Sequence, residues 1–112
     1  MAFGNNPARV DDWGNLMCKC GQGGNIHQAN TTIFERGEDN TTTTVIAQNG
    51  KDVQVSNFPS ADTCNPSPRR HGLIIEFECE QCHYDRDGNR EGPLHRLAIF
   101  QHKGNTFVEW EE

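Results

Sequence analysis

Residues 73–83 read LIIEFECEQCH, a stretch in which a strand pattern ends in two closely spaced cysteines. Apolar residues alternate with glutamates from Ile75 to Glu80, so that Ile75, Phe77 and Cys79 share one face. Alternation with a period of two is typical of a β-strand with one buried face and one solvated face. The stretch therefore predicts a strand that delivers Cys79 to the interior.

A second pair of cysteines, near the start of the chain, completes a set of four thiols. Cys79 and Cys82 have the spacing of a zinc knuckle, in which a tight turn brings two sulfurs onto one ion. Cys18 and Cys20 are two residues apart, and such residues project to the same side of an extended segment. We therefore predict a structural zinc ion, bound by Cys18, Cys20, Cys79 and Cys82, that ties the two ends of a β domain together.

The same residues have other interpretations. His27 or His83 can replace one thiolate ligand, because imidazole nitrogen also binds zinc. Residues 79–83 match the CxxCH pattern of covalent haem attachment, and a closely spaced cysteine pair can act as a redox dithiol. Buried thiols without any metal are a further alternative. Cys64, in a proline-rich loop, is predicted to be a spare thiol.

The rest of the chain has the pattern of an all-β protein. Short segments rich in β-branched and aromatic residues alternate with turn residues, and no segment of helical length has a helical period. The predicted strands are 31–36, 42–48, 51–56, 73–79, 94–101 and 106–110. Asn49-Gly50 predicts one hairpin, and residues 103–105 predict another. We expect a small antiparallel sheet or sandwich of about six strands, closed by a zinc-ribbon-like site of four cysteines.

The size of the chain predicts one domain, residues 1–112, with residues 1–15 as a flexible N-terminal arm. Only 33% of the residues are hydrophobic, so the core is small. A structural zinc ion, which contributes on the order of 10 kcal/mol to folding, would stabilise it strongly. The first residues lack the basic start and apolar run of a signal peptide, and no segment resembles a membrane span. We therefore expect a cytoplasmic protein with no membrane contact.

The charge balance limits the choice of partner. A formal net charge of −6 argues against sequence-blind binding to nucleic acids, where neutralising phosphates supplies most of the affinity. Residues 65–71, NPSPRRH, and residues 101–104, QHKG, nevertheless predict a local basic patch. Guanidinium groups bind phosphates and carboxylates through paired hydrogen bonds. The candidate partner-binding residues are Arg69, Arg70, His102 and Lys103.

Residues 35–39, ERGED, form an acidic turn with two interpretations. Its carboxylates can pair with the two arginines in surface ion pairs, which are common and weak. Alternatively, Glu35, Glu38 and Asp39 can bind a divalent cation, as in a metal-dependent hydrolase. No motif pairs a histidine with a nucleophile, so the sequence predicts no catalytic residue.

Several motifs together resemble a family of small phage and bacterial proteins with zinc-ribbon-like cysteine pairs. The motifs are CKCG at 18–21, Ile26-His27, IFERGED at 33–39, NPSPRR at 65–70, ECEQC at 78–82 and QHKGNTFVEW at 101–110. The pair Cys18 and Cys20 is spaced one residue more tightly than is usual in that family. The resemblance implies no activity, but it implies a phage-type accessory protein whose partner is a host or phage protein that handles nucleic acids. Direct nucleic-acid binding and metal-dependent hydrolysis are the alternative functions.

Overall fold

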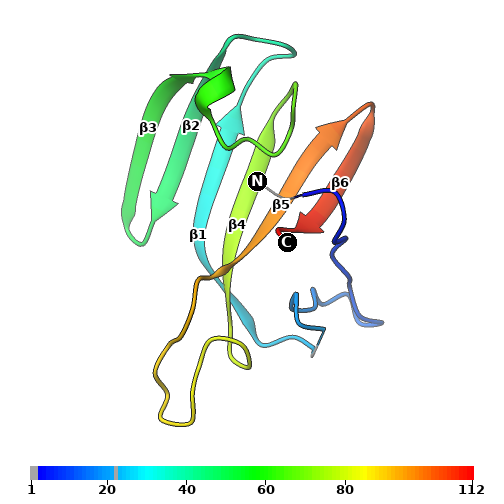
Figure 1. Ribbon diagram of the computed structural model, residues 1–112, viewed down its shortest axis with the longest axis vertical. Helices are drawn as coiled ribbons and strands as arrows, with labels where there is room; N and C mark the ends of the chain where they lie inside the picture. The colour runs from blue at the N-terminus through cyan, green and yellow to red at the C-terminus, as the bar shows by residue number, and fades with distance from the viewer. Residues whose placement is uncertain (1–2, 22) are drawn as a thin grey trace.

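The protein is an open antiparallel sheet of six strands in the computed structural model, which describes residues 3–21 and 23–112. The strands are β1 (Ile26–Glu35), β2 (Thr42–Asn49), β3 (Asp52–Pro59), β4 (Gly72–Cys79), β5 (His95–His102) and β6 (Asn105–Trp110). Their order is β3-β2-β1-β4-β5-β6, which places β1 and β4 at the centre (Figure 1). A short 3-10 helix, Ser60–Asp62, follows β3. Among the described residues, no helix is long and apolar enough to cross a membrane.

The predicted all-β class is confirmed, and every predicted strand overlaps an observed one. Of the two predicted architectures, the single sheet describes the structure and the sandwich does not. The largest difference in bounds is at β1, which begins at Ile26 and not at Thr31. The early part of β1 is rich in polar residues, so hydrophobic periodicity could not reveal it. Its pairing with β4 orders it, across a β-bulge between Gln28 and Asn30.

Both predicted hairpins are present. At the β2–β3 tip, the strand register centres the turn on Gly50 and Lys51, one residue later than the sequence predicts. Gly50 has a φ of 61°, which suits a two-residue turn with glycine at its first central position. At the β5–β6 tip, Lys103 and Gly104 have φ values of 51° and 82°. A type I′ hairpin turn requires positive φ at both of its central residues, as observed here.

The sheet has a hydrophobic cluster on each face, and β4 contributes to both. Ile74 and Phe77 are 1% and 7% exposed, and residues an odd number apart in a strand point to opposite faces. The sequence pattern predicts burial on the Phe77 side alone. One cluster contains Phe34, Ile74, Ala98 and Phe100, and the other contains Phe77, Leu97 and Trp110. The central strand is therefore buried from both sides over part of its length.

Residues 59–71 cover the first cluster, so we call this side of the sheet the loop face (Figure 1). Ser67 is 2% exposed, and its hydroxyl donates to the Gln101 carbonyl oxygen at 2.9 Å. The Asn65 side chain accepts the Ser67 N–H at 3.0 Å and donates to the Arg70 carbonyl oxygen at 2.8 Å. The Ser67 bond holds the loop against β5, and the two Asn65 bonds stabilise the irregular loop itself.

The N-terminal segment, predicted as an arm, runs along β6 and reaches the second side of the sheet, which we call the open face. The Ala8 N–H donates to the Val108 carbonyl oxygen at 2.9 Å, and the Trp110 N–H donates to the Asn6 carbonyl oxygen at 2.8 Å. Ala8 and Leu16 then pack against the Phe77 cluster. The segment thus covers one end of the open face.

Gly72 lies where the loop and the sheet meet. A Cβ atom at this position would overlap the Asn65 side-chain oxygen and lie 2.9 Å from Pro66 Cδ. We expect Gly72→Ala to lower the free energy of unfolding by about 1–3 kcal/mol, because the loop must move away from β4. Gly37→Ala is the matched control, since its Cβ would meet no atom closer than 3.8 Å. Urea denaturation measures both changes, and equal losses of stability would contradict the close contact.

Candidate metal centre

The four predicted ligands, Cys18, Cys20, Cys79 and Cys82, come together beside the end of β4. Their Sγ atoms all lie within 4.8 Å of one another, and those of Cys18 and Cys82 are 3.7 Å apart. Four sulfurs placed tetrahedrally at about 2.3 Å from one ion are separated by roughly 3.8 Å. The four cysteines therefore lie close enough to hold one metal ion.

Each cysteine pair is presented by a tight turn. The His83 N–H donates to the Cys79 carbonyl oxygen at 2.9 Å and closes the turn that carries Cys82. The Gly21 N–H donates to the Cys18 carbonyl oxygen at 2.9 Å. Gly21 has a φ of 78°, so the chain can reverse directly after the first pair. One cysteine of each pair is buried and the other is exposed, which places the centre just beneath the surface.

His83 supports the second turn through both of its ring nitrogens. Nδ1 accepts the Cys79 N–H at 2.7 Å, and Nε2 lies 2.8 Å from the Pro93 carbonyl oxygen. Because Nδ1 accepts a hydrogen bond, the ring proton is on Nε2, which donates to Pro93. His83 is 3% exposed, and these two hydrogen bonds join the cysteine turn to the far end of the long loop before β5. The sequence indicated His83 only as a possible ligand, because this positioning role depends on how the loop before β5 folds back.

The other candidate residues near the centre lie outside the sulfur cluster. His27, the possible substitute ligand, has Nε2 at 3.4 Å from a Glu80 carboxylate oxygen, and both side chains are more than half exposed. Cys64 is exposed in the loop that covers the loop face. Within the described part of the chain, the group that could hold a metal consists of the four cysteines alone.

The electrostatics of the cluster favour a bound cation. Burial raises the pKa of the Cys18 thiol far above its usual value. Burial, followed by the neighbouring sulfurs of Cys20 and Cys79, raises the pKa of Cys82 to about 12. Four thiolates this close repel one another strongly, whereas a divalent metal ion offsets their charge and deprotonates the thiols that bind it.

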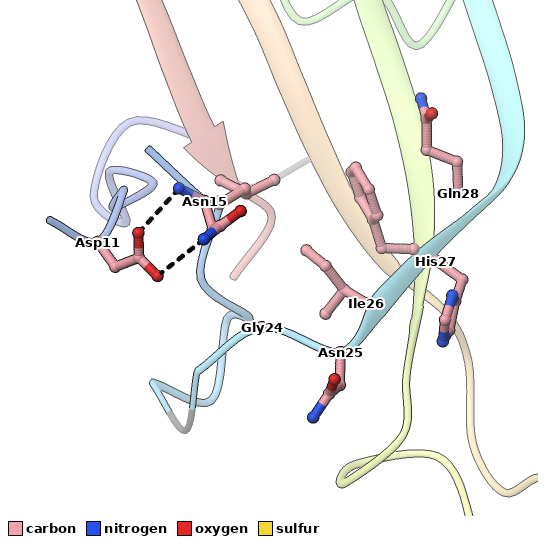
Figure 2. Close-up of a pocket in the computed structure, with 9 residues that line it drawn as sticks. Asp11, Asn15, Gly24, Asn25, Ile26, His27 and Gln28 are labelled. Carbon is pink, nitrogen blue, oxygen red and sulfur yellow. Dashed lines mark hydrogen bonds between the residues drawn. The ribbon is translucent and has the colours of Figure 1, made fainter. Parts of the chain in front are cut away.

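A cavity of about 850 Å³ opens between the N-terminal segment and the start of β1 (Figure 2). Of the predicted site residues, His27 lines it. The Asp11 carboxylate, also in its wall, accepts the Asn15 N–H at 2.9 Å, and this bond is the main cause of a lowered Asp11 pKa. Figure 2 shows the paired hydrogen bonds between Asp11 and Asn15, so this carboxylate stabilises its own turn.

The two arginines predicted to bind a partner form ion pairs within the chain. Arg69 donates to the Asp39 carboxylate through Nε at 2.8 Å and through Nη2 at 2.6 Å. These hydrogen bonds hold the pKa of Asp39 below its usual value. Arg70 donates to the Glu38 carboxylate at 2.8 Å. The alternative interpretation, surface ion pairs with the acidic turn, therefore describes both arginines, and two of the three carboxylates suggested for hydrolysis are occupied.

The other two predicted contact residues, His102 and Lys103, lie at the β5–β6 tip. His102 lines a cavity together with Pro66 and Pro68 from the loop that precedes the arginines. The hairpin tip and the arginine loop are therefore neighbours, and the basic patch that they form is partly neutralised by the acidic turn.

A row of aliphatic side chains, not predicted from the sequence, crosses the open face. Strand pairing aligns one residue from each of the six strands in direct register. In sheet order this aliphatic row is Val55, Ile46, Ile33, Leu73, Ile99 and Val108. Val55, Ile33 and Val108 are 65%, 42% and 40% exposed. The alignment depends on non-local register, which the pattern within single strands does not specify.

Comparisons with known protein families, with curated proteins and with solved structures found no match. The geometry of the sheet, its cysteine cluster and its exposed faces therefore carry the functional argument. These features define a small all-β protein with a four-cysteine site that could hold a metal ion.

Protein purified without chelators is expected to contain about one metal ion per chain, because four thiolates complete a tetrahedral site. Cys82→Ser should weaken metal binding by more than about 100-fold, since loss of a supporting outer group alone can cost that much. Cys64→Ser, which changes an exposed cysteine outside the cluster, is the matched control. Elemental mass spectrometry and a chelator competition measure both variants. Metal-free wild-type protein, or full affinity in Cys82→Ser, would contradict the assignment.

Proposed function

We propose that this chain is a zinc-stabilised binding module that uses the open face of its sheet to bind another protein. The aliphatic row carries the proposal. A sheet face is normally buried against a second layer, and large contiguous apolar patches on monomers mark interaction sites. Here the row extends from one edge strand to the other with three of its side chains at least 40% exposed.

Zinc is the metal that the donor set favours. Four thiolates select soft or borderline ions, and tetrahedral sulfur coordination is typical of zinc and iron–sulfur sites. The single cluster of four sulfurs, with sulfurs as close as 3.7 Å, suits one mononuclear ion. A zinc ion with four protein ligands has no open position for a substrate, so its proposed role is structural. The binding surface must then lie elsewhere on the sheet.

The chemistry of the row limits the partner to an uncharged apolar surface. Six strands about 4.8 Å apart span roughly 24 Å, and five residues along each strand span about 17 Å. A partner that covered this area would bury about 800 Å² over both surfaces, which is typical of a weak, transient interface. None of the six side chains is charged, so a charged partner surface would lose hydration without gaining an ion pair.

The resemblance to small phage and bacterial proteins suggests which protein binds there. We propose a cytoplasmic partner, of the host or of a phage, that handles nucleic acids. Direct contact with nucleic acid has less support, since Arg69 and Arg70 have carboxylate partners and the net charge is −6. Hydrolysis at the acidic turn also has less support, because the carboxylates of Glu38 and Asp39 already accept hydrogen bonds from the two arginines.

Replacing part of the row tests the proposal. The variant Ile33→Thr, Val55→Thr, Val108→Thr keeps side chains that suit strands but removes apolar surface. A partner captured from the native host with wild-type protein is identified and purified, and its affinity is then measured directly. We expect the triple variant to bind it at least about tenfold more weakly, which corresponds to about 1.4 kcal/mol.

Two controls separate this surface from the alternatives. Val10→Thr changes a valine that is 60% exposed and lies outside the row, so it should leave the affinity unchanged. Arg69→Ala with Arg70→Ala should also leave it unchanged. Loss of binding in the double arginine variant but not in the triple threonine variant would refute the proposal that the open face binds the partner. Recovery of nucleic acid in place of protein, released by added salt, would favour direct nucleic-acid binding.

A further inference from the structure

A second cavity lies on the loop face, on the opposite side of the sheet from the aliphatic row. It has a volume of about 360 Å³, within the range of small-ligand sites, and it opens to solvent. Its wall contains three aromatic rings and one acidic side chain, which come from the start of the chain, β5 and β6. These residues are Phe3, Phe100, Phe107 and Glu109.

The acidic residue in this cavity, Glu109, is buried without full hydrogen bonding. It is 6% exposed, and its Oε2 atom has no hydrogen-bond partner among residues 3–21 and 23–112. Ionising a buried carboxylate that lacks partners is energetically costly. Native proteins generally satisfy such groups with a protein donor, an ordered water molecule or an ion. An unsatisfied carboxylate in the wall of an open cavity therefore points to a group supplied from outside.

The neighbouring cations of the chain are already engaged. Arg96 lies on the same face of the adjacent strand, but its guanidinium donates to Glu111 at 2.9 Å. Arg69 donates to Asp39, away from the cavity wall. His102 lines the cavity, yet it forms no hydrogen bond with the Oε2 atom of Glu109 in the described structure. A cationic ligand in the cavity would supply the missing counter-charge to the Glu109 carboxylate.

The aromatic rings suit the same kind of ligand. Phe100 and Phe107 are stacked with centroids 5.5 Å apart, and Phe3 is tilted against Phe100 at 6.2 Å. Ring faces attract cations, and organic cations also gain from contact with apolar walls. An ammonium ion that carries alkyl groups satisfies both the rings and the carboxylate. A metal ion would leave the rings unused, and an anion would be repelled by Glu109.

From these contacts we propose that the cavity on the loop face binds a small alkylammonium ligand, with Glu109 as its counter-ion and Phe3, Phe100 and Phe107 around its alkyl groups. The site is independent of the metal centre and of the aliphatic row. The loop of residues 59–71 forms part of the wall through Pro66 and Pro68, so the ligand is held between this loop and the sheet.

Choline and its uncharged carbon analogue dimethylbutanol are matched probes for this site. Both are titrated into the metal-loaded full chain, and the backbone amide signals of Phe107 and Glu109 are followed by NMR. We expect choline to shift these signals and to bind at least about tenfold more tightly than dimethylbutanol, because it alone forms a charge-assisted contact. Equal affinity for the two probes, or no shift with millimolar choline, would overturn the proposal.

Variants test the role of the carboxylate. Glu109→Gln keeps the shape of the side chain and should weaken choline binding about tenfold while leaving dimethylbutanol binding unchanged. Glu78→Gln makes the same change in net charge on β4 and should have no effect on either probe. Unchanged choline affinity in Glu109→Gln would overturn the proposal. If Glu109→Gln fails to fold, the affinities of choline and dimethylbutanol for the wild-type protein still test whether the cavity prefers a cation.

Discussion

Four sulfur atoms from the N-terminal segment and from the end of the central strand β4 meet at one point, and the rest of the structure depends on this contact. The segment that carries Cys18 and Cys20 also supplies Ala8 and Leu16, which pack against Phe77, Leu97 and Trp110. A metal ion held by the four sulfurs would therefore fasten one covering layer of the sheet. The core is small, so an ion at this junction would supply a large share of the stability.

The two faces of the sheet then have different roles. On the loop face, hydrogen bonds of Ser67 and Asn65 hold residues 59–71, which form one wall of an open cavity lined by aromatic rings and Glu109. On the open face, the N-terminal segment covers only one end, and the aliphatic row remains exposed beyond it. One constraint at the end of the central strand thus leaves a broad apolar surface available for a partner, while the opposite face holds a small cavity that opens to solvent.

Local sequence patterns predicted the strands and the cysteine cluster because period-two alternation and ligand spacing are local properties. They could not predict features that depend on which strands pair. The aliphatic row exists only because six strands share one register. Glu109 lies in an alternating segment, TFVEW, that suggests a solvated acidic side chain, yet it is buried and lines a cavity together with Phe3 and residues of the loop. The pairing of Arg69 with Asp39 likewise depends on how the long loop folds back.

Hydrogen exchange with and without metal tests most directly whether the ion fastens the N-terminal segment to the sheet. The amides of Ala8, Met17 and Cys18 donate to carbonyl oxygens at 2.9 Å and can be followed individually. With metal bound, these amides should exchange slowly, and removal of the ion by a chelator should accelerate their exchange. If chelation removes the metal and leaves the exchange of all three amides unchanged, the ion does not hold this architecture together.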